Sequence, residues 1–338
     1  MKLKRLSLVI VSISISLFAG LFFAEVYLRI TAKLELQHRN ESKEAWAGDR
    51  KFRQAEDLML GYEYTPHESD GSWLGYKANS LGFPDKERNI VKSNTSYRIC
   101  VVGDSITEDG RYVEYLENKL NKGSGSHFEV WNCGVGGYGI LHYYANIRSK
   151  ILNFNPDLII ISFCLNDFNC TPVIYEDQDG KLIEYSNIYG YFSVPVNRQL
   201  FLRWRIYRLA LIALSRISSY FKANNHLPWQ TDNISRGRWA VQNILKLTDK
   251  AGIDVKGLII PYLKEDYTEQ EQLDYSDIKT VLDESGIKYL DMHGKFEDIG
   301  SARWRRERSD RIHPSEEGHR LISDHLYDFI EKTRLTER

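Results

Sequence analysis

Residues 99–107 read Ile-Cys-Val-Val-Gly-Asp-Ser-Ile-Thr, and they carry the clearest signal of the fold. Its β-branched run, 99–102, predicts a short buried strand that stops at Gly103. The segment 112–120 predicts a helix, so Ser105 falls between a strand end and a helix. A serine placed there can present its hydroxyl at the open edge of a sheet, where nearby amides can point at a developing oxyanion. A helix-capping serine fits the same pattern.

Strands and helices alternate along most of the chain beyond this stretch. Further strands are predicted at 128–132, 158–163, 255–260 and 288–291, and further helices at 141–154, 239–251, 275–285 and after Pro314. The strand at 158–163 is nearly all apolar, which is typical of a parallel strand covered on both faces. This alternation indicates an open parallel sheet with helices on both faces. We predict a three-layer α/β/α domain with a parallel sheet of about five strands.

The N-terminus carries the strongest compositional signal. Residues 6–24 contain no charged side chain and follow three basic residues. At the helical rise per residue, this segment comes close to the ~30 Å of a bilayer's hydrocarbon core. Neither Ala19 nor Ala24 completes a good small-x-small cleavage site. We therefore expect an uncleaved signal anchor at 1–30 that leaves the rest of the chain extracytoplasmic, in the periplasm or at the cell surface, with a cleaved signal peptide as the alternative.

The overall composition is that of an ordinary globular protein. The formal net charge of −1 over 338 residues gives no reason to expect nucleic acid as a partner. The four cysteines lack the close spacing of a metal site, while a disulfide between Cys164 and Cys170 is left open. Glycine and proline repeatedly interrupt residues 31–96, so we expect a stalk and an irregular extension there.

An insertion at 168–238 interrupts the alternation. Its middle, 197–222, mixes arginines with leucine and aromatic side chains. The pattern suits a lid helix packed on the domain, and it also suits an interfacial helix that rests on anionic lipid.

Three predicted strand ends carry groups suited to acyl transfer. In open α/β sheets, sites form beyond the carboxyl ends of the strands. Ser105 follows the first strand, Gly137 lies in the glycine-rich turn after the second, and Asn166 follows the third. Near the C-terminus, Asp310 and His313 supply the acid and base types that activate a serine. We expect these groups to meet at one edge of the sheet.

Four sequence blocks resemble the SGNH, or GDSL, family of serine esterases and acyltransferases. They are Gly103-Asp104-Ser105, Asn132-Cys133-Gly134-Val135-Gly136-Gly137, Asn166-Asp167 and Asp310-Arg311-Ile312-His313-Pro314. The resemblance spans about 97–330, and the extension at 79–83 is similar to that of membrane-anchored bacterial members. Two departures are Ile106 in place of leucine and Cys164 in place of glycine, and neither removes a catalytic group.

The resemblance implies a flavodoxin-like sheet in a hydrolase domain at 97–332. It also implies a catalytic triad of Ser105, His313 and Asp310. The amides of Ser105 and Gly137 and the side chain of Asn166 would then form the oxyanion hole. The long insertion means that the substrate class is not carried over from the family.

We therefore expect a serine esterase that cleaves an acetyl-glycan or lipid ester through an acyl-enzyme, with no cofactor. An O-acyltransferase acting on a cell-surface glycan would use the same residues. A non-catalytic, membrane-tethered binding protein with this fold is a further alternative.

A dinucleotide-binding oxidoreductase fits the glycine pattern at 134–139, but the next strand ends in Ser162-Phe163 rather than in a ribose-binding acid. His319 and His325 lie near His313 in sequence, but their neighbours are not typical ligands, so no metal is expected.

Overall fold

The structure is a computed structural model, and its described residues fall into two compact units. The described residues are 11–31, 52–57, 59–68, 77–122, 127–169, 173–176, 181–184, 200, 203–207, 209–210, 214, 232–297 and 300–336. The anchor unit comprises 1–49, 176–182 and 187–226, and the sheet unit comprises 50–175, 183–186 and 227–338. All the predicted site residues belong to the sheet unit.

The sheet unit is built on a five-stranded sheet with the strand order β4-β3-β5-β8-β9. The strands are β3 (Ser96–Val102), β4 (His127–Asn132), β5 (Leu158–Phe163), β8 (Asp254–Ile259) and β9 (Tyr289–Asp291). Every neighbouring pair is parallel, which confirms the predicted flavodoxin-like sheet. Strand β3 pairs with β4 on one side and β5 on the other, so the strand order reverses at β3. Ligand sites of open α/β sheets form at such a switch point.

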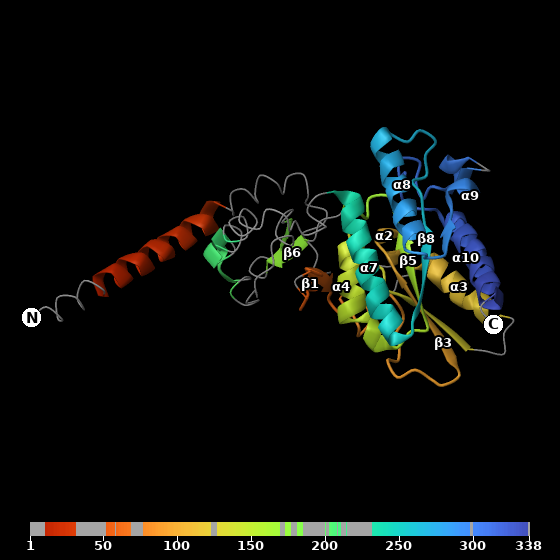
Figure 1. Cartoon of the computed structure of the whole chain (residues 1–338), viewed down its shortest axis with the longest axis horizontal. Helices are drawn as coiled ribbons and strands as arrows, with labels where there is room; N and C mark the ends of the chain where they lie inside the picture. The colour runs from red at the N-terminus through yellow and green to blue at the C-terminus, as the bar shows by residue number, and fades with distance from the viewer. Residues whose placement is uncertain are drawn as a thin grey trace, which may run out of the picture. The chain divides into compact units, whose positions relative to one another are not determined.

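Helices cover both faces of this sheet (Figure 1). Helix α3 packs against α10, whereas α4 packs against α7 and α7 against α8. The helices are α2 (Ser105–Glu108), α3 (Arg111–Asn121), α4 (Ile140–Ser149), α7 (Asn233–Ala251), α8 (Glu269–Glu284), α9 (His293–Glu297) and α10 (Glu316–Thr336), with 3₁₀ turns η1 (Ile151–Phe154) and η4 (Ser301–Trp304). A separate two-stranded sheet contains β6 (Val173–Glu176) and β7 (Lys181–Glu184).

Two helices begin earlier than their apolar periodicity predicts. Helix α7 begins at Asn233 rather than 239, because the Asp232 side chain accepts a hydrogen bond from Ser235 N at 2.6 Å. Helix α8 begins at Glu269 rather than 275, and Thr268 and Glu271 form a reciprocal capping box at its start. The caps set these starts, because the first turns of both helices are mainly polar and carry little of the hydrophobic period.

The described part of the 31–96 segment contains two short strands that the sequence analysis did not predict. Strands β1 (Phe52–Gln54) and β2 (Tyr62–Tyr64) pair in antiparallel fashion. Arg53 and Glu63 face each other in the pairing and form an ion pair at 2.7 Å. Tyr62 and Tyr64 are both buried. Strands of three residues are too short for period-2 alternation to stand out from the surrounding turns.

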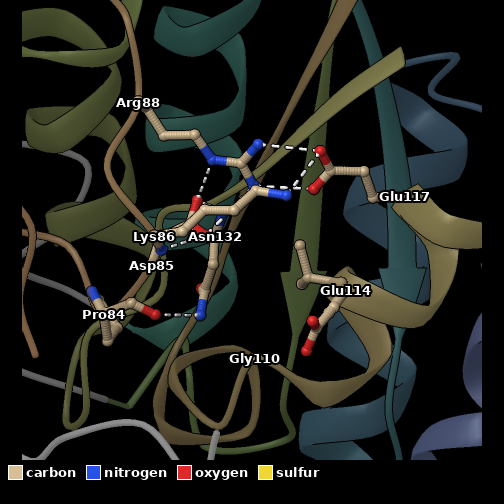
Figure 2. Close-up of a pocket in the computed structure, with 9 residues that line it drawn as sticks. Pro84, Asp85, Lys86, Arg88, Gly110, Glu114, Glu117 and Asn132 are labelled. Atoms are coloured by element: carbon tan, nitrogen blue, oxygen red, sulfur yellow. Dashed lines mark hydrogen bonds and ion pairs between the residues drawn. The ribbon is translucent and has the colours of Figure 1, made fainter. Parts of the chain in front are cut away.

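A charged cluster anchors the end of this segment to β4 and α3 (Figure 2). The Arg88 guanidinium bonds Asp85 at 2.8 Å and Glu117 at 2.9 Å. Asp85 in turn accepts a hydrogen bond from the backbone of Asn132 at 3.1 Å, and the Asn132 side chain donates to Pro84 O at 3.1 Å. The cluster therefore holds Asn132, the residue from which the glycine-rich loop begins.

In the anchor unit, the helix Val11–Thr31 is long and apolar enough to cross a membrane. A membrane anchor and a signal sequence both fit such a helix. Glu25 on this helix is only 3% exposed, and it accepts hydrogen bonds from Arg205 N at 3.2 Å and Ile206 N at 2.9 Å. Part of the arginine-rich segment thus lies against the helix, while most of that segment lies outside the described residues.

Three cysteines, Cys100, Cys133 and Cys164, are buried free thiols. Cys170 lies outside the described residues.

Candidate active site

Ser105 is the first residue of α2 and lies directly beyond the end of β3. The helix is capped by Asp104, whose carboxylate accepts a hydrogen bond from Ile106 N at 2.9 Å. Ser105 therefore is not the capping residue. Gly103 allows this sharp turn because a Cβ there would lie 2.0 Å from Thr107 Oγ1. Burial raises the pKa of Asp104 to about 6.

The structure brings His313 to Ser105 although 208 positions separate them in the sequence. Ser105 Oγ lies 2.9 Å from His313 Nε2. His313 Nδ1 lies 2.9 Å from Asp310 Oδ2 and 3.1 Å from Oδ1. One ring nitrogen thus faces the hydroxyl and the other faces the carboxylate. This arrangement lets a histidine accept the serine proton while the carboxylate orients the ring.

Asp310 is held by three further hydrogen bonds. Its Oδ1 accepts the backbone N–H groups of Ile312 and His313, each at 3.0 Å, and its Oδ2 accepts Arg306 Nη2 at 2.8 Å. Burial by itself would raise the pKa of Asp310, but the hydrogen bonds from the His313 and Ile312 backbones and the nearby His313 charge lower it below its usual value. The carboxyl group therefore stays ionised near neutral pH.

Gly137 lies in a tight turn of the loop after β4. Tyr138 N donates to Val135 O at 3.1 Å and closes the turn. Gly137 has a φ of +78°, which L side chains rarely adopt and which turns of this kind require at their third residue. A Cβ on the preceding Gly136 would lie 3.8 Å from Ser105 Cβ, so this loop passes beside the serine.

Asn166 lies in the turn after β5, on the other side of β3 from the Gly137 loop. Its neighbour Asp167 is fully buried and accepts hydrogen bonds from Cys164 N and Tyr143 Oη, both at 2.9 Å. Burial raises the pKa of Asp167 well above its usual value. Because β4 and β5 flank β3, the loops that carry Gly137 and Asn166 flank the loop that carries Ser105.

Two groups that contact this site were not predicted from the sequence. One is Arg306, which bonds Asp310, and the other is Tyr62, whose hydroxyl donates to Gly136 O at 2.6 Å. The Tyr138 hydroxyl donates back to Tyr62 O. Tyr62 comes from a segment interrupted by glycine and proline, and its sequence neighbourhood carries no signal of a site.

Within the described part of the chain, no group of three or more histidine, cysteine, aspartate or glutamate residues is arranged to hold a metal ion. His319, the histidine nearest to His313 in sequence, lies 3.3 Å from Asp109 and is fully buried.

The chain matches the profile of the GDSL-like lipase/acylhydrolase family over residues 101–321, a stretch that contains all four sequence blocks. No curated protein matches the chain.

Several solved structures are similar. One is a catalytic mutant of Axe2, an acetylxylan esterase from Geobacillus stearothermophilus, with 14% identity and a TM-score of 0.45 over 72% of this chain and 96% of that chain. Another is LAE5, an alpha/beta hydrolase enzyme from the metagenome of Lake Arreo, Spain, with 14% identity and a TM-score of 0.44 over 71% and 96%. A third is the acetyl xylan esterase AlAXEase, with 16% identity and a TM-score of 0.41 over 68% and 98%.

Proposed function

The chain belongs to the GDSL-like lipase/acylhydrolase family, whose members hydrolyse esters, and on this basis we propose that Ser105, His313 and Asp310 form its catalytic triad. The observation that carries the proposal is the continuous line of contacts from Ser105 Oγ to His313 Nε2 and from His313 Nδ1 to Asp310, each at 2.9 Å. Nucleophile, base and orienting acid are recognised by this geometry rather than by their positions in the sequence.

In the first half of the proposed reaction, Ser105 Oγ attacks the carbonyl carbon of the ester. His313 Nε2 takes the hydroxyl proton, and Asp310 stabilises the resulting imidazolium. The tetrahedral intermediate collapses, its C–O bond to the alcohol breaks, and His313 gives the proton to the departing alcohol. In the second half, His313 deprotonates a water molecule that attacks the acyl carbon. The second tetrahedral intermediate then collapses, its bond to Ser105 Oγ breaks, and His313 returns the proton to Oγ as the acid product leaves.

The carbonyl oxygen becomes negatively charged in both halves of the reaction. We assign its stabilisation to the backbone amides of Ser105 and Gly137 and to the side-chain amide of Asn166. Their loops follow β3, β4 and β5, which are neighbours in the sheet. Loss of one such donor typically costs about 2.7–4 kcal/mol of transition-state stabilisation.

For the whole chain, we propose an N-terminal membrane anchor at 1–30, an extension at 31–96, and an extracytoplasmic hydrolase domain at 97–332 whose insertion spans 168–238. The apolar helix Val11–Thr31 supports the anchor. The ester substrate is an acetylated glycan or a lipid. Turnover of p-nitrophenyl esters of increasing chain length tests this point, because a preference for acetyl indicates a glycan and a preference for long chains indicates a lipid.

The test of the triad is Ser105→Ala in the full chain. We expect the variant to lose p-nitrophenyl acetate turnover and covalent labelling by a fluorophosphonate, because the substitution removes the hydroxyl that attacks the ester in the proposed reaction. Ser149→Ala is the matched control, since the Ser149 hydroxyl bonds Ala145 O within α4. Full turnover by a folded Ser105→Ala variant would overturn the proposal.

A further inference from the structure

The peptide that joins Gly136 to Gly137 is the central peptide of the turn 135–138. The turn's own hydrogen bond runs from Tyr138 N to Val135 O and involves neither group of that peptide. Type I and type II turns share such a closing bond but differ by about a half-rotation of the central peptide. Glycine tolerates either form at the third position. A contact from outside the turn is therefore needed to select one orientation.

Tyr62 on β2 supplies such a contact. Its hydroxyl donates to Gly136 O at 2.6 Å, and Gly137 has the positive φ of the type II form. The Tyr62 side chain is itself held in place, because the residue is 1% exposed and its ring packs edge-to-face on Phe52 at 5.0 Å and on Tyr138 at 5.2 Å. The reciprocal bond from the Tyr138 hydroxyl to Tyr62 O joins β2 to the loop a second time.

We propose that Tyr62 is a positioning residue for the oxyanion hole, with its hydroxyl holding the Gly136–Gly137 peptide so that Gly137 N–H serves the reacting carbonyl. A trans peptide is planar, and its C=O and N–H point in opposite directions, so a contact that holds the oxygen also sets the direction of the N–H. A hydrogen bond to the carbonyl also polarises the peptide and strengthens its N–H as a donor. The inference rests on the proposed function, because it requires Gly137 N–H as an oxyanion donor.

The inference gives the N-terminal extension a part in catalysis. Strand β2 lies outside the four sequence blocks, yet its Tyr62 bonds Gly136, which belongs to the second block. At the start of the same loop, the Asn132 side chain accepts a hydrogen bond from Gly134 N at 3.0 Å, while Asp85 and Pro84 bond Asn132. Two parts of the extension thus hold the loop at two points.

The test is Tyr62→Phe in the full chain, assayed with p-nitrophenyl acetate. The variant keeps the ring and its packing, so we expect the melting temperature to change little. Removal of an oxyanion donor typically lowers kcat by 10²- to 10³-fold, and here the donor stays but loses its support, so we expect a fall in kcat of about tenfold. KM should stay nearly unchanged, because the ground-state ester has no developed oxyanion. The rate of fluorophosphonate inactivation should fall in parallel with kcat.

Tyr144→Phe is the matched control. Tyr144 lies on α4, and its ring packs edge-to-face on Trp239 with ring centroids 5.0 Å apart. We expect this variant, which loses a tyrosine hydroxyl elsewhere in the sheet unit, to keep the wild-type kcat. Equal slowing in both variants would show that the effect is not specific to the Tyr62 hydroxyl and would overturn the inference.

The same experiment separates the two proposals. A wild-type kcat in Tyr62→Phe, together with an inactive Ser105→Ala, would overturn the inference alone. Full activity in Ser105→Ala would overturn the proposed function, and the inference would fall with it.

Discussion

Two histidine–aspartate pairs in the sheet unit have the same chemistry and different surroundings. His313 lies 2.9 Å from Asp310, and their side chains are 24% and 16% exposed. His319 lies 3.3 Å from Asp109, and their side chains are 0% and 3% exposed. The first ring also faces the Ser105 hydroxyl, whereas the second stacks on Tyr112 with ring centroids 5.9 Å apart.

The difference shows that two histidine–carboxylate pairs of similar distance can differ in whether the ring reaches a hydroxyl. Burial lowers the pKa of His319 despite the opposing effect of Asp109. Burial alone would raise the pKa of Asp109, but hydrogen bonds from His319 and Arg111 lower it to about 2. A general base must reach the proton that it removes. His313 meets that requirement, while the full burial of His319 gives it a structural role.

The largest effect is expected from replacing the two histidines in turn. His313→Gln should lower kcat by about 10⁴- to 10⁶-fold and leave stability nearly unchanged, because the loss of one triad member removes the function of the whole triad. His319→Gln should keep nearly all of kcat but lower the free energy of unfolding by about 1–3 kcal/mol, because it removes a buried ring that stacks on Tyr112 and lies 3.3 Å from Asp109. Ester turnover and urea unfolding measure the two effects. A folded but inactive His319→Gln would contradict the distinction.

Replacing Asp310 should mainly lower activity, and replacing Asp109 should mainly lower stability. The loss of activity should be smaller than for His313. Asp310→Asn is expected to lower kcat by about 10⁴-fold, since an amide favours the wrong tautomer of His313. Asp109→Asn should mainly lower stability, because it removes the charge that pairs with Arg111 at 2.6 Å. The comparison fails if Asp109→Asn loses as much activity as Asp310→Asn at equal stability.

The smallest effect concerns pH, and it uses a third histidine. Burial lowers the pKa of His142 from 6.5 to about 3, so the folded protein keeps it neutral where the unfolded chain protonates it. Its contribution to stability is complete above pH 6.5 and declines as the pH falls, because the unfolded state then binds more protons. Wild type should therefore lose stability relative to His142→Gln below that pH, by about 1 kcal/mol per pH unit.

Unfolding of both proteins at several pH values between neutral and mildly acidic measures this difference. The variant is needed as a reference because Asp104 also titrates in this pH range. Burial raises its pKa to about 6, so its effect on the free energy of unfolding has the opposite sign as the pH falls. A stability difference that is constant with pH would contradict the prediction.

Much of the fold could be predicted because its signals are local. The apolar run at Leu158–Phe163 predicted a buried strand with the same bounds that the structure has. The starts of α7 and α8 could not be placed by periodicity, because hydrogen bonds from Asp232 and Thr268 set them. Strands β1 and β2 were missed, since three-residue strands depend on their packing partners rather than on their own pattern.

The candidate site also has residues with a local sequence signal and residues without one. Ser105, Gly137, Asn166, Asp310 and His313 could be named as candidates because each lies in a short block with a distinctive neighbourhood. Arg306 and Tyr62 were missed, because their importance comes from what they bond across space.

The alternation of strands and helices, the apolar N-terminal helix and the residue types available for acyl transfer could all be read from the amino-acid order, because they depend on near neighbours along the chain. The remaining features appear only in the folded chain. Folding makes Asp104 rather than Ser105 the helix cap, places His313 against Ser105 across 208 positions, buries His319, and brings the Tyr62 hydroxyl to Gly136 O. Apart from the cap, these contacts join segments that are far apart in sequence, so no local pattern encodes them. The strand order explains one part of the site, because β3 lies between β4 and β5 and the loops that carry Ser105, Gly137 and Asn166 therefore meet at one edge of the sheet.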